Sequence, residues 1–310
     1  MNSIYKFFIL LSIIVLASFF IKATRQEAIK IDTNTILKND TDKNVSDSYE
    51  IKAIKMPDHL EFAGEIVPLD KQDVYERMDR ELHVNTYWQS NTLLYAKRAN
   101  KFFPIIEKIL AEKGIPDDFK YLALIESGLQ NVISPAGAKG FWQIMKTTGK
   151  EAKLEINSNI DERYHLEKST IVACAYLKEA HAKFGSWTLA AAAYNAGRGG
   201  INKQLKKQQT NNYYDLLLGE ETSRYLFRII AAKEILSNPK KYGFTYTDKD
   251  LYKPFDTYTV EVDSVITNIS SFAKHHGISY KELKLLNPWL IENKLNNSSK
   301  RKYLIALPKS

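Results

Sequence analysis

Apolar residues recur at three- and four-residue intervals through most of the chain between residues 69 and 238. This spacing places them on one face of a helix, and no alternating pattern typical of a strand interrupts it. A short helix is expected between Pro116 and Gly128, since proline suits the start of a helix and glycine its end. Ser186 is a suitable N-cap for another. We predict an all-α domain with further helices at residues 69–99, 102–113, 170–184, 187–196 and 220–236.

The pattern changes near the C-terminus. Residues 258–262 and 303–307 alternate between apolar and polar, as strands do, and residues 269–276 and 280–286 have the spacing of two short helices. We therefore predict a small α+β domain with the order β-α-α-β at residues 258–308. A linker at 245–257 would join it to the helical domain, which we place at residues 57–244.

Near the N-terminus, one basic residue precedes an apolar run. Lys6 is followed by residues 7–21, which carry no charge and are fewer than the roughly 20 that a membrane span needs. This favours a signal peptide within residues 1–23, but a clear small-residue cleavage site is missing, so an N-terminal membrane anchor stays open. Either segment exports the rest of the chain. Residues 24–56 are polar and predict a flexible linker.

Composition narrows the choice of partners. The net charge of +8 favours anionic partners without choosing one. Acidic residues are interspersed among the basic ones and no reader motif is present, so we predict no nucleic-acid binding. A single cysteine, Cys174, excludes an internal disulfide and has the setting of a small core residue. The histidines are not spaced as ligand pairs, and we predict neither a metal site nor a cofactor.

One carboxylate stands out in the short helix after Pro116. Phe119, Leu122, Glu126 and Leu129 share one helical face by their three- and four-residue spacing, and Glu126 is the only polar residue among them. No lysine or arginine lies at helical spacing beside it. An inward-facing carboxylate of this kind has a raised pKa, which a general acid working near neutral pH requires. Glu126 is thus the leading candidate for chemistry.

Three polar blocks interrupt the apolar pattern of the helical domain. Taken singly, each has a structural explanation: a satisfied glutamate, a buried loop aromatic, or a capped helix. Together they fit a groove for a sugar polymer, in which flat rings cover sugar faces and amides bind hydroxyl groups. Trp142 and Tyr194 would supply the rings, and Gln143 and Asn195 the amides. The blocks are Glu126-Ser127-Gly128, Gly140-Phe141-Trp142-Gln143-Ile144 and Ala193-Tyr194-Asn195-Ala196-Gly197.

In this order the blocks resemble those of the lytic transglycosylase family, whose SLT domain has a goose-lysozyme-like helical fold. The E-S-G, G-F-W-Q-I and A-Y-N-A-G blocks are followed by Glu221-Thr222-Ser223-Arg224-Tyr225, which is similar to the family's E-T-x-x-Y block. The resemblance covers residues 57–244 and is greatest to the membrane-bound D type. Four ordered blocks make a specific signal, although any one of them alone would be weak.

The resemblance implies the roles of several residues. Glu126 would be the sole catalytic acid and base, protonating the oxygen between N-acetylmuramic acid and N-acetylglucosamine. It would then deprotonate the muramic 6-hydroxyl, giving a 1,6-anhydro product without water. Ser127 would orient the acid, and Tyr225 would lie near Glu126. The substrate-binding residues implied are Ser127, Trp142, Gln143, Tyr194, Asn195 and Tyr225.

The other carboxylates must be considered as possible catalytic partners, because ordinary glycosidases use two carboxyl groups. These groups lie ~5–5.5 Å apart in retaining enzymes and ~6.5–9.5 Å apart in inverting ones. Asp117 and Asp118 lie at a helix start, where negative charge suits the helix dipole, and we interpret them as structural. Glu221 and Asp161 are harder to dismiss from the sequence, but the family assigns neither as a nucleophile.

The C-terminal domain resembles a LysM module, a unit that binds peptidoglycan. Tyr258-Thr259-Val260, Leu286-Asn287-Pro288 and Ile305-Ala306-Leu307-Pro308 match its pattern. Two segments depart from it: Val262-Asp263-Ser264 after the first strand, and Lys300-Arg301-Lys302-Tyr303 before the last. These departures leave glycan binding by this domain open.

We therefore expect an exported bacterial enzyme of the periplasm or cell envelope that cleaves peptidoglycan strands as a monomer. Attachment to a membrane would run through the N-terminal segment. Two alternatives remain at this point. A lysozyme-like muramidase would use the same acid with water as the nucleophile. A non-catalytic wall-binding or scaffold protein would bind the polymer and release no product.

Overall fold

The computed structural model describes residues 51–298 and 300–309. The predicted export segment, residues 1–23, and all but the end of the predicted polar linker lie outside these residues. Within the described part of the chain, no helix combines the length and the apolar character needed to cross a membrane. The described residues are mainly helical, with two small antiparallel sheets. The helical character and the C-terminal sheet were predicted, whereas the short sheet at residues 61–66 was not.

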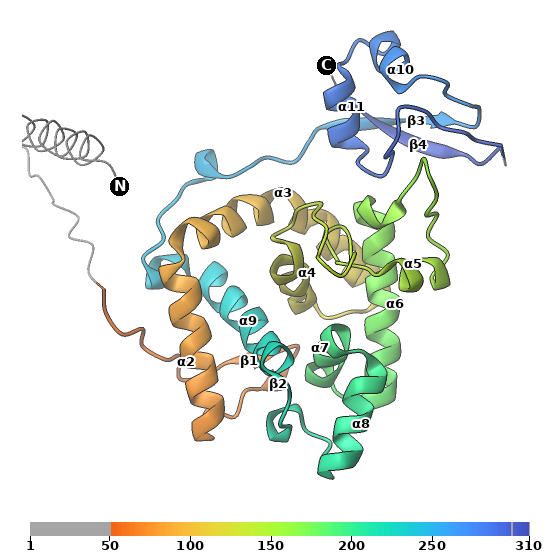
Figure 1. The fold of residues 1–310 in the computed structure, drawn as a ribbon. Helices are drawn as coiled ribbons and strands as arrows, with labels where there is room; N and C mark the ends of the chain where they lie inside the picture. Colours follow the sequence, from red (N-terminus) through yellow and green to blue (C-terminus); the bar gives the residue numbers. More distant parts are fainter. Residues whose placement is uncertain (1–50, 299, 310) are drawn as a thin grey trace, which may run out of the picture. The chain divides into compact units, whose positions relative to one another are not determined.

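A bundle of helices follows a two-stranded hairpin (Figure 1). Short 3-10 turns connect several of these elements; they are η1 (Asp117–Phe119), η2 (Glu162–Tyr164), η3 (Tyr213–Asp215) and η4 (Pro239–Tyr242). The strands and helices are β1 (Glu61–Phe62), β2 (Glu65–Ile66), α2 (Gln72–Tyr87), α3 (Gln89–Lys113), α4 (Lys120–Ser127), α5 (Lys146–Glu151), α6 (Leu166–Phe184), α7 (Trp187–Ala196), α8 (Arg198–Gln208) and α9 (Glu220–Ser237).

The first two helices differ from the prediction. The sequence indicates a break near residues 100–101, but the structure places it at Trp88, and α3 then continues through Pro104 to Lys113. The reason is a buried stripe that crosses the expected break without a change of spacing. It comprises Ala96, Ala99, Phe103, Ile106 and Leu110. Two helices were missed: α5, which is short, and α8, in which Ile201 is the one buried residue.

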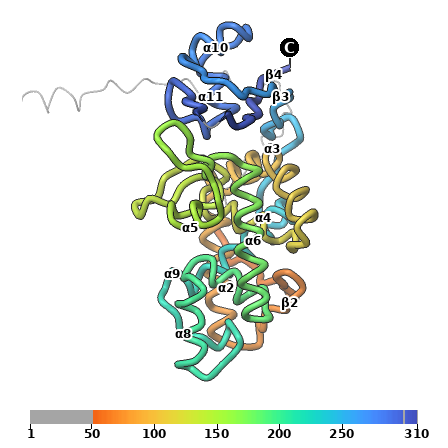
Figure 2. Tube along the Cα trace, turned by 90° about the vertical axis from the view of Figure 1, so that its right-hand side faces the viewer, coloured from red at the N-terminus to blue at the C-terminus, as the bar shows by residue number. Residues whose placement is uncertain are grey.

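Helix α4 lies in the middle of the bundle. It packs on α3 and α9, while α9 also packs on α2 and α7, and α6 packs on α3 and α7. Figures 1 and 2 show α4 enclosed by these neighbours. The run of buried alanines at residues 190–193 of α7 permits close approach of the neighbouring helices. Ser186 caps α7 as predicted, accepting a hydrogen bond from the Leu189 amide.

The C-terminal domain has the predicted β-α-α-β order. Strands β3 (Thr257–Val262) and β4 (Tyr303–Pro308) pair antiparallel, with Val262 opposite Tyr303. Helices α10 (Ile269–His275) and α11 (Tyr280–Leu286) lie between them in sequence. Alternate residues of β4, namely Tyr303, Ile305 and Leu307, are buried in a separate apolar core. The apolar positions that alternate in the sequence are therefore the ones that this strand buries.

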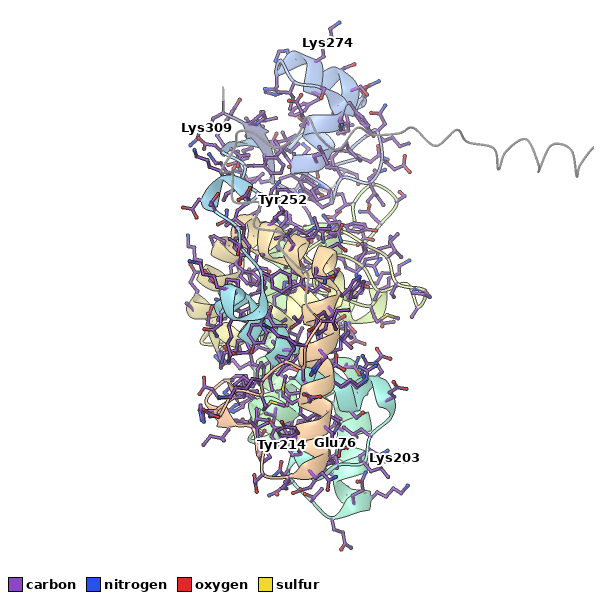
Figure 3. All side chains as sticks on the ribbon, turned by 90° about the vertical axis from the view of Figure 1, so that its left-hand side faces the viewer. Glu76, Lys203, Tyr214, Tyr252, Lys274 and Lys309 are labelled. Atoms are coloured by element: carbon purple, nitrogen blue, oxygen red, sulfur yellow. The ribbon has the colours of Figure 1, made fainter. Side chains whose placement is uncertain are left out.

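The predicted linker follows the surface of α3. The Tyr252 amide donates to the Lys97 carbonyl oxygen, and the Asn100 side chain donates to the Tyr252 carbonyl oxygen. The Lys97 ammonium group also donates to the carbonyl oxygen of Asp250, in the 3-10 turn η5 (Asp248–Asp250). Figure 3 labels Tyr252 on this connector. Hydrogen bonds with both the backbone and the side chains of α3 thus hold the connector against this helix.

Candidate active site

Glu126 occupies the last turn of α4. The preceding 3-10 turn begins after Pro116, and Gly128 ends the helix in the left-handed conformation with a φ of 62°. All other residues from 121 to 129 are buried, and Glu126 alone reaches partial exposure. The sequence prediction of a single carboxylate on an apolar face is therefore confirmed in geometry. An acid in this position can meet a substrate while most of its surroundings stay dry.

The environment of Glu126 moves its pKa in two directions. Burial raises the pKa above the usual glutamate value, and it is the largest cause. The Tyr225 hydroxyl and the Arg228 guanidinium oppose this change by stabilising the charged form, whereas the Glu221 carboxylate raises the pKa further. The net effect is a raised pKa. A raised pKa extends the pH range over which the carboxyl group keeps its proton, as a general acid requires, and the group becomes a carboxylate after giving the proton away.

Helix α9 supplies the direct partner of this acid. Tyr225 is 2% exposed, and its hydroxyl donates a hydrogen bond to Oε1 of Glu126. Burial, followed by the charge of Glu126, raises the pKa of Tyr225 well above its usual value, so the phenol stays protonated and remains a donor. The sequence placed Tyr225 near Glu126 through the resemblance alone. Because Oε1 is taken by Tyr225, the other carboxyl oxygen is the one left for a substrate.

Arg228 was missed in the sequence. It follows Tyr225 by three residues on α9, so both side chains share a face, and its guanidinium donates to the Ile125 carbonyl oxygen at 3.2 Å. This contact holds the arginine beside the end of α4, where its charge acts on Glu126. The spacing of Tyr225 and Arg228 is a signal that could have identified it.

Ser127 joins the end of α4 to the following loop. Its hydroxyl donates to the carbonyl oxygens of Phe141, at 2.8 Å, and Ala123, at 3.2 Å, rather than to the Glu126 carboxylate. The hydroxyl of Ser127 is thus directed to the backbone, and the expectation that this residue orients the acid stays a prediction. Its effect on Glu126 passes through the backbone, because it fixes the last turn of α4 against Phe141.

Gln143 lies in the loop at a strained position. Its φ of 46° is in the left-handed region, which costs a residue with a side chain roughly 1 kcal/mol. The side-chain nitrogen donates to the carbonyl oxygens of Val132, at 3.2 Å, and Gly140, at 2.8 Å. Gln143 is partly exposed, so its amide oxygen can face a ligand while its nitrogen holds the loop.

The neighbouring Trp142 has a different position from the one predicted. Its side chain is 0% exposed, and Nε1 donates to the Thr170 hydroxyl of α6 at 2.8 Å. The prediction that its ring covers a sugar face is wrong, because no face of the ring is accessible. The hypothesis of a sugar groove put the ring on the surface, and the alternative of a buried loop aromatic is the one that the structure shows. Its indole instead anchors the loop to the core through the hydrogen bond that a buried tryptophan needs.

Tyr194 and Asn195 bring the third polar block to the same site. The Tyr194 hydroxyl donates to the Trp142 carbonyl oxygen at 2.7 Å, and Tyr194 is partly exposed. Burial raises the pKa of Tyr194 well above its usual value, and the charge of Glu126 adds to this effect. The Asn195 amide donates to Glu221 at 3.1 Å and accepts from Thr222 at 2.7 Å. Residues about a hundred positions apart thus meet around Glu126.

The remaining acidic candidates have structural partners. Asp118 accepts from the Ala63 amide at 2.6 Å and from Lys233 at 2.7 Å, and Asp117 pairs with Lys120. Asp161 is 2% exposed and its pKa lies below the usual value; burial opposes this shift, but hydrogen bonds from Arg163 and Lys139 outweigh it. Of the four carboxylates weighed in the sequence, Glu221 is the one whose charge acts on Glu126.

Cys174 is a core residue. It is 1% exposed on α6, and burial raises the pKa of its thiol to about 12. A thiol with this pKa carries almost no thiolate near neutral pH, and thiolate is the reactive form. The structural interpretation made from its apolar neighbours is confirmed.

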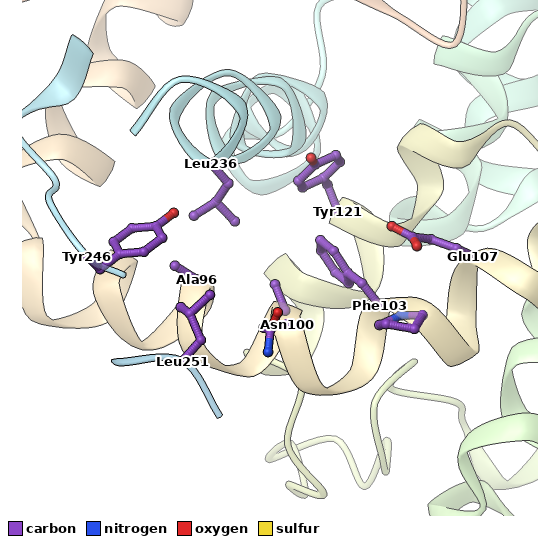
Figure 4. Close-up of a pocket in the computed structure, with 10 residues that line it drawn as sticks. Ala96, Asn100, Phe103, Glu107, Tyr121, Leu236, Tyr246 and Leu251 are labelled. Carbon is purple, nitrogen blue, oxygen red and sulfur yellow. The ribbon is translucent and has the colours of Figure 1, made fainter. Parts of the chain in front are cut away.

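A cavity of about 300 Å³ lies on another side of α4 (Figure 4). It is bounded by α3, by Tyr121 of α4, by Leu236 of α9 and by the connector residues Tyr246 and Leu251. Tyr121 and Glu126 are five residues apart on the helix, so they point in different directions. None of the candidate site residues borders this cavity, and the chemistry around Glu126 is separate from it.

Comparison with known proteins identifies two domains. The family model described as "Transglycosylase SLT domain" matches residues 103–217, and the one described as "Soluble lytic transglycosylase C-terminal LysM-like domain" matches residues 258–310. Membrane-bound lytic murein transglycosylase D of Escherichia coli (strain K12) is 27% identical over 220 residues, which are 69% of this chain and 47% of that protein. The protein of the same name from Escherichia coli O6:H1 gives the same values.

The chain thus spans about half the length of the curated relatives it matches. The first match includes α4 with Glu126, the loop with Gln143 and α7 with Asn195. The second includes both helices of the C-terminal domain and strand β4. The chain therefore contains an SLT transglycosylase domain followed by a LysM-like domain, and it is homologous to the membrane-bound lytic murein transglycosylases D.

Proposed function

We propose that this protein cleaves the β-1,4 bond between N-acetylmuramic acid and N-acetylglucosamine in peptidoglycan and leaves a 1,6-anhydromuramoyl end. The observation that carries the proposal is the single carboxylic acid at the end of α4, with its raised pKa and its bond from Tyr225. The match to the SLT transglycosylase domain and the homology to the lytic murein transglycosylases D support the substrate class.

In the first step, the protonated carboxyl group of Glu126 gives its proton to the glycosidic oxygen as the bond to C1 breaks. The carboxylate that forms is stabilised by the hydrogen bond from Tyr225 and by the positive charge of Arg228. These two groups favour the charged form, so their effect grows as the proton leaves. The acid therefore needs no movement to change its role.

In the second step, the Glu126 carboxylate takes the proton from the muramic 6-hydroxyl as that oxygen attacks C1. The proton returns to the enzyme and the ring closes without water. One residue thus serves as acid and then as base, which is consistent with a site where Glu126 is the partly exposed carboxylate on a buried helix. Glu221, exposed and bonded to Asn195, tunes the pKa of Glu126 in this scheme.

The residues around the acid would hold the sugar. Gln143 and Asn195 are partly exposed amides, and both can bind hydroxyl or N-acetyl groups. Tyr194 would contribute the edge of its ring, since its hydroxyl is held by the Trp142 carbonyl oxygen. We propose no direct contact between Trp142 and the substrate, because the ring is enclosed.

An envelope location follows from the substrate. Peptidoglycan lies outside the cytoplasmic membrane, and the apolar residues 7–21 supply a means of export. The curated relatives are named membrane-bound. We propose that the protein acts in the cell envelope, with the N-terminal segment serving as a signal or as an anchor.

The test is digestion of purified sacculi by the full-length protein. Wild type should release soluble muropeptides, and Glu126→Gln should release none above background. Glu221→Gln is the matched control: the same change is made to an exposed carboxylate of the same site, and most activity should remain. Equal release by wild type and Glu126→Gln would rule out the proposal. Loss of release in Glu221→Gln would instead favour a hydrolase with two carboxylates.

A further inference from the structure

The segment from Glu155 to His165 belongs to the helical domain and contacts the LysM-like domain. The Asp161 amide donates to the Trp289 carbonyl oxygen, and the Ile291 amide donates to the Asn159 carbonyl oxygen, both at 2.9 Å. Ile160 lies between these bonds, is 1% exposed and belongs to the apolar core of the LysM-like domain. In Figure 1 the green chain before α6 reaches up to this domain. The LysM-like domain thus uses a residue of the other domain to complete its core.

Aromatic and charged side chains enlarge this interface. The rings of His165, Trp289 and Tyr303 form a stack, with centroid distances of 5.9 and 5.8 Å. Trp289 is 4% exposed, and Tyr303 donates its hydroxyl to Glu155 at 2.9 Å. Glu155 also pairs with Arg301 at 3.2 Å. Arg301 and Tyr303 lie in the segment that departs from the LysM pattern, so this departure has a partner inside the molecule.

The same segment holds the loop of the candidate site. Arg163 is 3% exposed, and its guanidinium donates to the carbonyl oxygens of Gly137, at 3.1 Å, and Ile144, at 3.3 Å. It also forms two bonds to Asp161, whose second partner is Lys139. The planar guanidinium can satisfy all of these acceptors at once, which a lysine cannot do.

These contacts place one short segment between two regions. One end is fixed by the LysM-like domain at residues 159–161, and Arg163 and Asp161 fix residues 137–144. The loop in turn carries Gln143 and presents the Phe141 carbonyl oxygen to Ser127 beside Glu126. A displacement at the interface would therefore reach the site through the Arg163 side chain and the loop that it holds.

We propose that the LysM-like domain acts as a positioning element for the substrate-binding loop, with Arg163 as the positioning residue that transmits its effect. In this arrangement Trp289 and Tyr303 serve the interface between domains. An independent wall anchor would need no such contacts with the helical domain. The inference rests on the proposed function only for its activity readout.

Substrates of different size can distinguish a positioning element from a wall anchor. A wall anchor increases activity on sacculi and has no effect on a short soluble glycan, whereas a positioning element affects both. Ile160→Ala in the full-length protein removes the apolar contact with the LysM-like domain. Ile171→Ala, at a 43% exposed position on α6, is the matched control. A purified soluble tetrasaccharide of the wall polymer and intact sacculi are the two substrates.

We expect Ile160→Ala to lower kcat/KM about tenfold on both substrates, within the ~10²-fold that a small misplacement costs. Arg163→Lys should produce the same loss, while its pH profile keeps the wild-type shape because Glu126 and its partners are unchanged. Ile171→Ala should resemble wild type. A loss confined to sacculi, or wild-type activity of Ile160→Ala on both substrates, would overturn the proposal.

Amide hydrogen exchange supplies a readout that does not depend on activity. The Gly140 and Ile144 amides are bonded to the Val132 and Lys139 carbonyl oxygens within the loop. Their exchange should become faster in Ile160→Ala and in Arg163→Lys, with exchange in α2 and α9 unchanged. Unchanged exchange at both amides in both variants would contradict the proposal, even if the enzyme activity itself proved different. Faster exchange throughout α2 and α9 would show general unfolding and also count against it.

Discussion

Tyr225 donates its hydroxyl hydrogen to Oε1 of Glu126, and both residues lie on neighbouring helices in the centre of the bundle. Burial raises the pKa of each group above its usual value. The bond favours the charged form of Glu126 and opposes the effect of burial. One phenol therefore sets how readily the acid gives up its proton, which is the property that a residue with two successive roles requires.

Replacing Tyr225 by phenylalanine should change the pH profile. The hydrogen bond from Tyr225 lowers the pKa of Glu126, so its loss should raise that pKa further. Activity needs the protonated acid in the first step, and kcat/KM falls as the pH rises above the pKa of the free enzyme. We expect this falling limb to move to higher pH in Tyr225→Phe, with a lower maximum. The profile of kcat/KM on a soluble glycan provides the measurement.

The matched control is Tyr176→Phe. Tyr176 is also partly buried, but its hydroxyl donates to the Ala193 carbonyl oxygen and not to the acid. The falling limb of the kcat/KM profile of Tyr176→Phe should coincide with that of the wild-type protein. A shift of the limb to lower pH in Tyr225→Phe would show that the direction assigned to this bond is incorrect.

Replacing Glu126 by glutamine should stabilise the fold at neutral pH. The pKa of Glu126 is raised in the folded protein above its unfolded value, so the contribution of this group is favourable below the unfolded pKa and is lost as the pH rises through the folded pKa. Glutamine carries no charge to bury and can still accept from Tyr225. We expect a gain on the order of 1 kcal/mol in urea unfolding at neutral pH.

The gain should vanish under acidic conditions. Below the ordinary glutamate pKa, Glu126 is protonated in both states, and the two proteins should unfold at similar urea concentrations. A gain of equal size at acidic and neutral pH would mean that charge burial is not its cause.

Gly140 should tolerate no side chain. A Cβ atom there would lie 2.1 Å from the Arg163 carbonyl oxygen, whereas a Cβ at Gly137 would meet nothing within 4 Å. Both glycines have positive φ, at 79° and 83°, so Gly137→Ala is a control for backbone strain. We expect Gly140→Ala to lose about 1–3 kcal/mol more stability than Gly137→Ala, as overpacking does. Urea unfolding of the two variants measures the difference, and equal losses would contradict the contact.

Trp142 offers a test of the corrected position of this residue. Because its ring is enclosed and bonded to Thr170, Trp142→Phe should lower stability by about 1–3 kcal/mol through lost packing. Glycan affinity should stay near that of the parent when both are measured in a Glu126→Gln background. If affinity fell tenfold or more with no change in urea unfolding, the ring would be a sugar platform after all.

The sequence was informative where local chemistry decides the structure. Glu126 could be found because a carboxylate on an apolar helical face breaks the periodicity, and Ser186 and Gly128 mark helix ends by their own properties. The continuation of α3 through Pro104 was missed because polar residues at 100–101 interrupt the local pattern on the exposed side. The buried residues of α3, which stabilise the helix by packing, continue on the opposite face without interruption.

The rest of the site depends on contacts between distant segments. Trp142 lies in a loop beside Gln143, yet Thr170 of α6 accepts its Nε1 hydrogen. Arg163 meets the loop at Gly137 and Ile144 only after the chain has folded back. Periodicity carries no information about such pairings, because it describes one element at a time. The chemistry could therefore be assigned to Glu126, but not the groups that hold its surroundings.

The account depends most directly on how the glycosidic bond is broken at Glu126. Purified sacculi digested by the full-length protein in heavy-oxygen water, followed by mass spectrometry of the muropeptides, tests this. We predict 1,6-anhydromuramoyl ends that are lighter than reducing ends by one water and carry no heavy oxygen, with no products from Glu126→Gln. Reducing ends labelled with heavy oxygen, made by the wild-type protein, would contradict it and identify a hydrolase.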